Sequence, residues 1–233
     1  MQRRFTGTRR PNGGNATTAK KVAKKVRGAG PRDPERTRAA ILAAAVKEFT
    51  DNGYGGARID SIARRSGANK RMIYHYFGDK DGLYLAVLES AYAAIRSAES
   101  ELRLAELAPT AAIERLVEFT WDYFIGHPEF LSLLNTENLH RAKFLKQSRN
   151  ITNLHSPLVS VIADILKRGV ASGEFRTGVD PVHVYISIAS LGFFYLSNRW
   201  TLSTIFRRDL ADPKELRAWG AHIAAVVLSA LRA

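Results

Sequence analysis

The sequence predicts an all-α fold, and two observations carry that prediction. Apolar residues recur at the three- and four-residue spacing of helices, while no segment alternates apolar and polar residues as a half-buried strand would. A helix-start signal, an Asp followed directly by Pro, occurs at Asp33, Asp180 and Asp212. We therefore expect helices rather than a sheet to build the core.

Length and composition limit the class of protein. A chain of 233 residues with 45% hydrophobic residues can bury a full core in one or two domains. No apolar run reaches the roughly 18 residues that a membrane-spanning helix needs, and no apolar segment follows the basic N-terminus as in a secretory signal. With no cysteine, disulfides and thiolate-bound zinc are excluded. We expect a cytoplasmic protein without a membrane partner.

The positive charge is concentrated near the N-terminus. The net charge is +13, and residues 1–32 hold ten Lys or Arg and no acidic residue. This composition predicts a disordered basic arm that contacts DNA phosphates or the minor groove. A solvated leader that only improves solubility, or a start codon assigned too far upstream, are the alternatives. Residues 34–80 are also basic, with nine cationic and five acidic side chains, so the expected partner is a polyanion, most plausibly DNA.

The first predicted helix starts at Asp33-Pro34-Glu35, where an Asp cap, a Pro and an acidic residue occupy the first turn. Its inward face follows at helical spacing, and the helix runs to about Gly53. Tyr54-Gly55-Gly56 forms the connecting loop. The apolar residues of this face are Ile41, Leu42, Ala45, Val46 and Phe49.

Two short helices follow, joined by a tight turn. Ile59, Ile62 and Ala63 share one face of the first, which Ser66-Gly67 ends because Gly accepts left-handed backbone angles. Asn69 is placed to cap the second. There Ile73 and Phe77 point inward, which leaves a cationic outer face. This pattern is typical of a helix-turn-helix with its recognition helix.

The same stretch resembles the tetracycline-repressor (TetR) family of transcriptional regulators, from about Arg36 to Leu88. The residues that match are Ile62-Ala63, Gly67, Ile73-Tyr74-His75-Tyr76-Phe77, Lys80 and Leu83. Two positions depart from the family pattern. Ala57 stands where a Thr commonly caps the first helix of the motif, a loss of about 1 kcal/mol. Gly82 stands in the first turn of the next helix, where a better helix former is usual.

The outer face of the second short helix supplies the candidate DNA contacts. Arg and Lys pair with guanine edges or phosphates, and Tyr and His do so more weakly. The resemblance adds Asn69, Tyr76 and Lys80 near the DNA backbone, and helix N-termini favour phosphates at two further arginines. The alternative is an ordinary solvated helix face. The candidates are Arg36, Arg58, Asn69, Lys70, Arg71, Tyr74, His75, Tyr76 and Lys80.

The rest of the chain is predicted to form a second, helical domain. Asp79 caps a helix that reaches about Leu104, which in the family links the two domains. We expect a DNA-binding domain at 33–80 and a domain for effector binding and dimerisation at 81–233. Its further helices are predicted at 110–125, 128–147, 151–171, 181–207 and 213–231.

Aromatic residues are abundant in this second domain, with a few polar residues among them. An apolar cavity with a few polar groups is how small ligands are usually held, although aromatics at helical spacing are more often ordinary core. The resemblance implies an effector pocket here, for an unknown small molecule. The candidate lining residues are Trp121, Phe124, Asn135, Asn138, His140, Phe144, Phe194 and Asn198.

The last two predicted helices carry wider apolar faces than one core can use. This favours an isologous dimer built as a four-helix bundle, and the resemblance implies the same. The alternative is full burial within one chain. The candidate interface residues are Tyr185, Ala189, Phe193, Leu196, Ile223, Val226, Val227 and Ala230.

No catalytic constellation is present, so we expect neither an enzyme nor a cofactor. Glu137-x-x-His140 has metal-pair spacing, but one copy cannot build a dinuclear site. Tyr76-x-x-x-Lys80 mimics a dehydrogenase signature without the Gly-rich loop. The sequence predicts a homodimeric, ligand-responsive regulator that binds a double-stranded operator in the bacterial cytoplasm, associated with the nucleoid. The alternative is a sequence-tolerant architectural DNA-binding protein driven by the basic arm.

Overall fold

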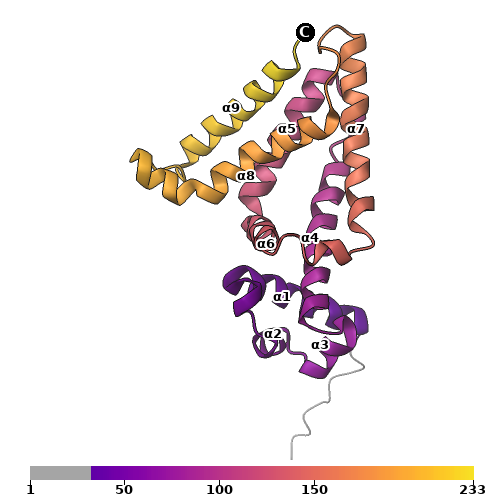
Figure 1. Cartoon of the computed structure of the whole chain (residues 1–233), viewed down its shortest axis with the longest axis vertical. Coiled ribbons are helices and arrows are strands. Elements are labelled where there is room, and N and C mark those ends of the chain that lie inside the picture. The colour runs from indigo at the N-terminus through magenta and orange to yellow at the C-terminus, as the bar shows by residue number, and fades with distance from the viewer. Residues whose placement is uncertain (1–32) are drawn as a thin grey trace, which may run out of the picture. The chain divides into compact units, whose positions relative to one another are not determined.

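The computed structural model describes residues 33–233, except for the side chains of 151–156. The described chain is helical and contains one isolated bridge, between Phe175 and Arg232, but no strand. The predicted all-α fold is confirmed, while the predicted arm at 1–32 lies outside the described residues. The helices are α1 (Pro34–Gly56), α2 (Ile59–Ser66), α3 (Lys70–Phe77), α4 (Lys80–Ser100), α5 (Pro109–Gly126), α6 (Pro128–Leu139), α7 (Ile151–Ala171), α8 (Pro181–Phe206) and α9 (Pro213–Leu231), with 3-10 turns η1 (Leu104–Glu106) and η2 (Leu145–Gln147) (Figure 1).

The predicted helix starts are confirmed by their capping hydrogen bonds. The carboxylates of Asp33, Asp180 and Asp212 each accept a hydrogen bond from the backbone N–H two residues on, at 3.0, 2.7 and 2.7 Å. Asp79 accepts from the N–H of Gly82 at 2.8 Å and starts α4. Each cap satisfies a backbone donor that has no partner within its own helix.

Gly82 is required by space rather than tolerated as a weak helix former. A Cβ atom added there would lie 2.2 Å from the backbone oxygen of Phe77. No side chain fits at that separation, because the obstacle is backbone and cannot rotate away. This departure from the family pattern therefore has a steric reason, since α3 and α4 meet closely at this point.

The first core joins α1, α2, α3 and the first half of α4. The predicted inward residues of α1–α3 are buried in it or packed against it. Leu133 of α6 and Phe144, just before η2, are also buried in this core. The rings of Tyr54, Tyr84 and Phe144 pack together, with centroids 4.6 to 5.2 Å apart. Chain segments on both sides of residue 80 therefore share one core.

The second core lies among α5, α7, α8 and α9. α5 packs against the other three helices, and α8 and α9 run side by side (Figure 1). Trp121 of α5 lies against Gly220 of α9, where an added Cβ would come within 2.7 Å of the indole ring. The indole N–H donates to the carbonyl of Leu216 at 3.1 Å. This contact holds α9 close to α5.

One helix is shorter than predicted. The segment 128–147 was expected to be one helix, but α6 ends at Leu139, and Arg141 and Ala142 take left-handed angles, with φ of 56° and 57°. The buried Glu137 carboxylate explains the turn, because its Oε1 accepts from the N–H groups of Phe144 and Leu145 at 3.0 and 2.9 Å. These bonds fold the chain back over the end of α6.

None of the helices in the described part of the chain is long and apolar enough to span a membrane.

Candidate functional site

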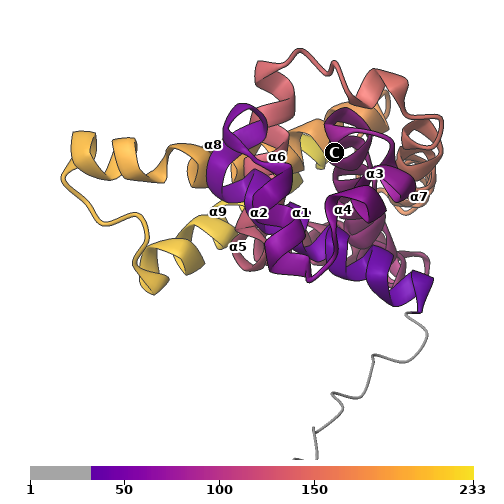
Figure 2. The same cartoon turned by 90° about the horizontal axis from the view of Figure 1, so that it is seen from below.

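The α2–α3 pair has the geometry that the sequence predicts for a helix-turn-helix. Gly67 ends α2 with a left-handed φ of 68°, which a residue with a side chain rarely adopts. The side chain of Asn69 then caps α3 by accepting from the N–H of Met72 at 2.9 Å. Ile73 anchors α3 in the first core, with no exposed surface. Figure 2 shows α1 to α3 from below, in front of the later helices.

The start of α2 is held by a buried glutamate of α1. Arg58, the N-cap residue, makes no side-chain capping bond, and Ala57 is buried, in agreement with the missing Thr cap. The Oε1 atom of Glu48 accepts from the N–H of Arg58 at 3.1 Å, and its Oε2 lies 3.9 Å from Arg65 Nη2. A carboxylate from α1 therefore stabilises the N-terminus of α2 in place of a local cap.

The outer face of α3 carries exposed Arg71, Tyr74 and His75. Lys70 is also exposed but forms an ion pair with Asp60 of α2, and the hydrogen bond to that carboxylate raises the pKa of Lys70. Arg71 has no ion-pair partner among the described residues. Of this set, Arg71 is the cation most available to an external partner.

The other predicted contacts surround this face less uniformly. Arg36 and Arg58 are exposed at helix starts. Tyr76 is half-buried, with its ring between those of His75 and Phe77 at centroid distances of 5.3 and 6.2 Å. Lys80 Nζ lies 4.7 Å from the centroid of the Tyr54 ring, and burial lowers the pKa of Lys80.

A second group of polar contacts connects the first core to the loop after α6. The hydroxyl of Tyr54 donates to the Asp81 carboxylate, and burial together with this bond raises the pKa of Tyr54 to about 12. Lys143 Nζ lies 3.2 Å from the other oxygen of Asp81. The hydrogen bond from Tyr54 and the pairing with Lys143 lower the pKa of Asp81. This group ties α1, α4 and the loop together.

A cavity of about 480 Å³ lies among α4, α5, α6 and α8. Apolar and aromatic side chains form most of its wall, and Arg96, Glu99, Asn138, Thr120 and Ser190 supply the polar groups. Its size and lining match those of sites that hold small molecules. The aromatic residues of the wall are Tyr92, Phe124, Phe130, Tyr185 and Phe193.

Arg96 and Glu99 form an ion pair at this cavity, both on α4. The side chains are 10% and 5% exposed, and Arg96 Nη1 lies 2.6 Å from Glu99 Oε2. The orientation is nevertheless unsuited to a hydrogen bond, so Nε and Nη1 of Arg96 and Oε2 of Glu99 have no hydrogen-bond partner within the described structure. Burial raises the pKa of Glu99 to about 7, against the opposing effect of Arg96.

The eight residues predicted to line an effector pocket are not brought together. Phe124 and Asn138 line the cavity just described, whereas Trp121 and Phe194 line two other hollows. Phe144 belongs to the first core, and the ring of His140 packs against it at 5.7 Å. Asn135 lies 3.4 Å from the Ser197 hydroxyl, and Asn198 donates to a backbone carbonyl of its own helix.

The residues predicted for a dimer interface are also divided. Tyr185, Ala189 and Phe193 face the cavity, and Leu196, Ile223 and Val227 are buried in the second core. Val226 and Ala230 remain on the exposed side of α9. The physical reason is that α8 carries apolar residues around its whole circumference, so its sequence cannot indicate which side faces inward. The large exposed apolar residues of these helices are Val182, Ile186, Phe194, Trp200, Ile205, Phe206 and Val226.

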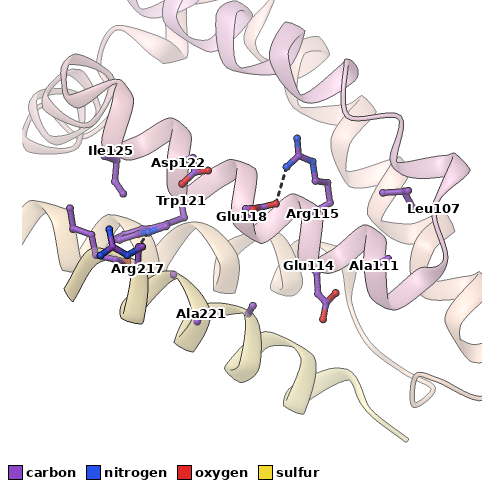
Figure 3. A pocket seen from close by; sticks show the side chains of 13 residues that line it. Leu107, Ala111, Glu114, Arg115, Glu118, Trp121, Asp122, Ile125, Arg217 and Ala221 are labelled. Carbon is purple, nitrogen blue, oxygen red and sulfur yellow. Dashed lines mark hydrogen bonds and ion pairs between the residues drawn. The ribbon is translucent and has the colours of Figure 1, made fainter. Parts of the chain in front are cut away.

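A different hollow, of about 680 Å³, lies between α5 and α9. Figure 3 shows Glu114, Glu118 and Asp122 along α5, with Arg115 paired to Glu118 at 2.8 Å. Burial raises the pKa of Asp122, with a smaller contribution from Glu118. These charges are exposed, in contrast to the buried pair of the first cavity.

The Glu137-x-x-His140 spacing serves the fold rather than an ion. Glu137 accepts two backbone N–H groups, and Nδ1 of His140 lies 2.8 Å from the carbonyl of Thr136. Among the described residues, no three His, Cys, Asp or Glu side chains gather as metal ligands would.

Sequence reasoning missed Glu48, Arg96 and Glu99. A weak signal existed for the pair, because Arg96 and Glu99 are one helical turn apart beside Tyr92 and Ile95, where a charge interrupts an apolar face. Glu48 similarly follows Ala44 and Ala45 on the inner face of α1. In each case, the partner that makes the charge tolerable comes into place only on folding.

Comparison with known proteins agrees with this geometry. The family described as "Bacterial regulatory proteins, tetR family" matches residues 41–87, and "Tetracyclin repressor-like, C-terminal domain" matches 109–227. The chain is 44% identical over 198 residues to the HTH-type transcriptional repressor NicS of Pseudomonas putida, covering 85% of this chain and 93% of that protein. It is 37% identical over 142 residues to the HTH-type transcriptional repressor SCO4008 of Streptomyces coelicolor, covering 60% and 69%.

Solved structures show the same fold. A putative transcriptional regulator, SCO4942 of Streptomyces coelicolor, aligns with a TM-score of 0.61 at 24% identity and covers 84% of this chain and 98% of its own. The regulator FadR of Bacillus subtilis, solved with stearoyl-CoA, aligns with a TM-score of 0.61 at 17% identity and covers 82% and 98%. The chain belongs to the TetR family of bacterial transcriptional regulators.

Proposed function

We propose that this regulator is a homodimeric repressor whose hold on its operator changes when a small molecule binds. Two α3 helices, one from each protomer, would enter successive major grooves about one helical turn apart at a pseudo-palindromic site. The observation that supports this most directly is α3 itself, which is capped by Asn69, anchored by Ile73 and exposes Arg71, Tyr74 and His75. Repressor is also the printed function of NicS and SCO4008. A partner on chromosomal DNA implies action in the cytoplasm.

The contacts of each side chain indicate a division of roles on DNA. Arg71 is free to form a bidentate pair with a guanine edge. Lys70 must first leave Asp60, so we assign it to phosphate, where a point charge suffices. Lys80 lies over the Tyr54 ring, just beyond α3, and is assigned to the flanking phosphates.

Arg71→Ala tests the proposed reading face. We expect operator binding to weaken by about 1–3 kcal/mol and discrimination among operator variants to relax. Fluorescence anisotropy with DNA from upstream of the neighbouring operon measures both. Lys167→Ala, which removes an exposed cation of α7, is the matched control and should bind as the parent does. Equal affinity of the Arg71 and parent proteins would remove Arg71 from the interface.

The alternative function, a sequence-tolerant architectural binder, makes the opposite prediction about specificity. A regulator should prefer its operator over random DNA by about 10³ or more. Deleting residues 1–32 should reduce the salt dependence of binding while sparing sequence preference, because phosphate contacts release counterions without reading bases. A preference that disappears with the arm would favour the architectural function.

The exposed apolar side of α8 and α9 supports the dimer. Phe194 and Trp200 are 60% and 64% exposed, which is unusual for large apolar residues of a monomer. We propose that this side, with Val226 and Ala230 of α9, packs on its symmetry mate as a four-helix bundle. Phe194→Glu should give monomers in sedimentation velocity and weaken operator binding, since one recognition helix then binds alone. A dimer that persists in this variant would place the interface elsewhere.

We assign effector binding to the cavity among α4, α5, α6 and α8. Helix α6 lines this cavity and also packs against α1, where the Ser132 hydroxyl contacts the Thr50 carbonyl at 3.4 Å. The Tyr84 hydroxyl contacts the Leu133 carbonyl, also at 3.4 Å. A ligand that favours one position of α6 can thereby favour one position of the DNA-binding helices. It can do so only if it binds the two states with different affinities.

A further inference from the structure

The ion pair at the cavity wall leaves hydrogen-bonding capacity unused. Arg96 is nine-tenths buried, yet its Nε and Nη1 have no acceptor, although Glu99 lies within ion-pairing distance. Buried polar groups normally have hydrogen-bond partners, and the exceptions call for an explanation. Because Arg96 and Glu99 line the cavity, a bound molecule can supply the acceptors that the protein does not.

We propose that the cavity binds a planar aromatic molecule bearing a carboxylate, and that this carboxylate accepts hydrogen bonds from the free edge of Arg96. This inference rests on the proposed function of the cavity as the effector site. It adds the chemical class of the ligand.

The charge of the ligand follows from the donors. Nε and one Nη of a guanidinium form a planar fork that matches the two oxygens of a carboxylate. Arg96 carries the positive charge among the residues that line this cavity, and Glu99 carries the negative one. A neutral ligand would leave at least one of the two Arg96 donors without a charged acceptor, whereas a carboxylate satisfies both.

The aromatic body follows from the walls and the volume. The Tyr185 ring lies beside the guanidinium, with its centroid 5.6 Å from Arg96 Cζ. The Phe130 ring meets those of Tyr92 and Phe124 at 5.6 and 6.0 Å, so ring faces and edges surround the space. Rings of this kind stack on a planar ligand or meet it edge-on. A volume of about 480 Å³ suits a molecule of one or two rings.

The proposal also assigns a role to Glu99. Its charged and titratable neighbours are Arg96 on its own helix, Tyr123 on α5 and Tyr185 on α8, while the α6 wall contributes the uncharged Asn138. A ligand carboxylate at Arg96 would repel an ionised Glu99. Glu99 therefore takes a proton from solvent when the ligand binds. Since burial already brings the pKa of Glu99 to about 7, little free energy opposes this step near neutral pH.

Linkage sets the sign of the resulting pH dependence. Below pH 7 the free protein already holds the Glu99 proton, so affinity for an ionised carboxylate should be nearly constant. Above pH 7 binding takes up a proton, so affinity should fall by up to about tenfold per pH unit. Glu99→Gln should remove this fall and retain binding, because the amide cannot ionise.

The test is calorimetric titration of the full-length protein with probes that separate charge from shape. Benzoate and 2-naphthoate carry both features, benzamide lacks the charge, and acetate lacks the ring. We expect the two aromatic carboxylates to bind at least tenfold more tightly than benzamide and acetate. Equal binding of benzamide and benzoate would overturn the proposal, as would failure of both aromatic carboxylates to bind.

Two arginine variants locate the binding site. Arg96→Gln should weaken benzoate binding at least tenfold. Arg115→Gln is the matched control, because Arg115 forms the same one-turn pair with Glu118, but on the exposed surface of α5 (Figure 3). Circular dichroism with thermal unfolding checks that both variants are folded. Unchanged binding in folded Arg96→Gln, or a loss specific to Arg115→Gln, would overturn the assignment. If Arg96→Gln is unfolded, the Glu99→Gln pH profile decides, and a fall in affinity above pH 7 in that variant contradicts the proposal.

Operator binding in the presence of each probe separates this inference from the proposed function. Aromatic carboxylates that bind through Arg96 but leave operator affinity unchanged would refute ligand control through this cavity and keep the ligand class. Release of the operator by neutral molecules, independent of Arg96, would refute the ligand class and keep the regulator.

Discussion

The two cores of this protein treat buried carboxylates differently. In the first core, Glu48 and Glu137 each direct one oxygen at backbone N–H groups, at 2.9 to 3.1 Å. At the cavity beside the second core, Glu99 faces the side chain of Arg96 without a hydrogen bond from it. The backbone donors cannot move away from their acceptor, whereas the side-chain pair can rearrange.

This difference separates structural from adaptable charge. Glu48 starts α2, and Glu137 turns the chain after α6, so both position the helices that meet DNA. Replacing a buried pair such as Arg96–Glu99 by apolar residues often leaves stability unchanged or higher, so stability alone gives no reason for the pair. We infer that the first core uses its buried charge to fix geometry and the cavity keeps its charge for a ligand.

The largest expected effect is that of Glu137→Ala, which breaks the structural half of the comparison. It removes the acceptor from two N–H groups, of which that of Phe144 is buried, and should lower the free energy of unfolding by about 3 kcal/mol. Chemical denaturation measures the change. Glu114→Ala, at an exposed position of α5, should alter stability by no more than about 0.5 kcal/mol. Similar losses in both variants would show that the two backbone bonds contribute little.

The pH dependence of stability tests the adaptable half. The pKa of Glu99 is raised from its ordinary 4.5 to about 7, so the folded protein binds a proton that the unfolded chain releases. Stability should therefore fall as pH rises between those values, by at most about 3 kcal/mol for this group. The difference between the parent and Glu99→Gln in denaturation from pH 4.5 to 7.5 isolates this contribution. Parallel stability curves for the two proteins would mean that Glu99 is not held neutral.

The smallest expected effect comes from Gly82→Ala, which sharpens the picture of a closely packed first core. Ala usually favours a helix by about 1 kcal/mol, but here its Cβ would meet the Phe77 backbone oxygen. We expect a net loss of about 1–2 kcal/mol in thermal unfolding. Gly55→Ala, where nothing lies within 4 Å of the added atom, should be neutral or stabilising. Stabilisation by both substitutions would show that the α3–α4 contact relaxes easily.

Much of this molecule could be predicted from local pattern. The Asp-Pro starts at 33, 180 and 212, the Gly67 turn, the Asn69 cap and the inward Ile73 are all encoded within a few residues, because capping and turn chemistry act at short range. The helix-turn-helix was therefore evident before the structure. The early end of α6 was not, since it depends on hydrogen bonds from Glu137 to residues seven and eight positions further on.

The sequence by itself determined the helical class, the DNA-reading helix and the family. Only the tertiary structure decided which side of α8 faces the cavity, since that helix is apolar all round and its periodicity has no preferred direction. It also decided that Phe144 joins the first core and that Arg96 and Glu99 meet at a cavity wall. Local chemistry specifies where helices begin and end, whereas the environment of a buried charge depends on helices that are distant in the chain and come together only on folding.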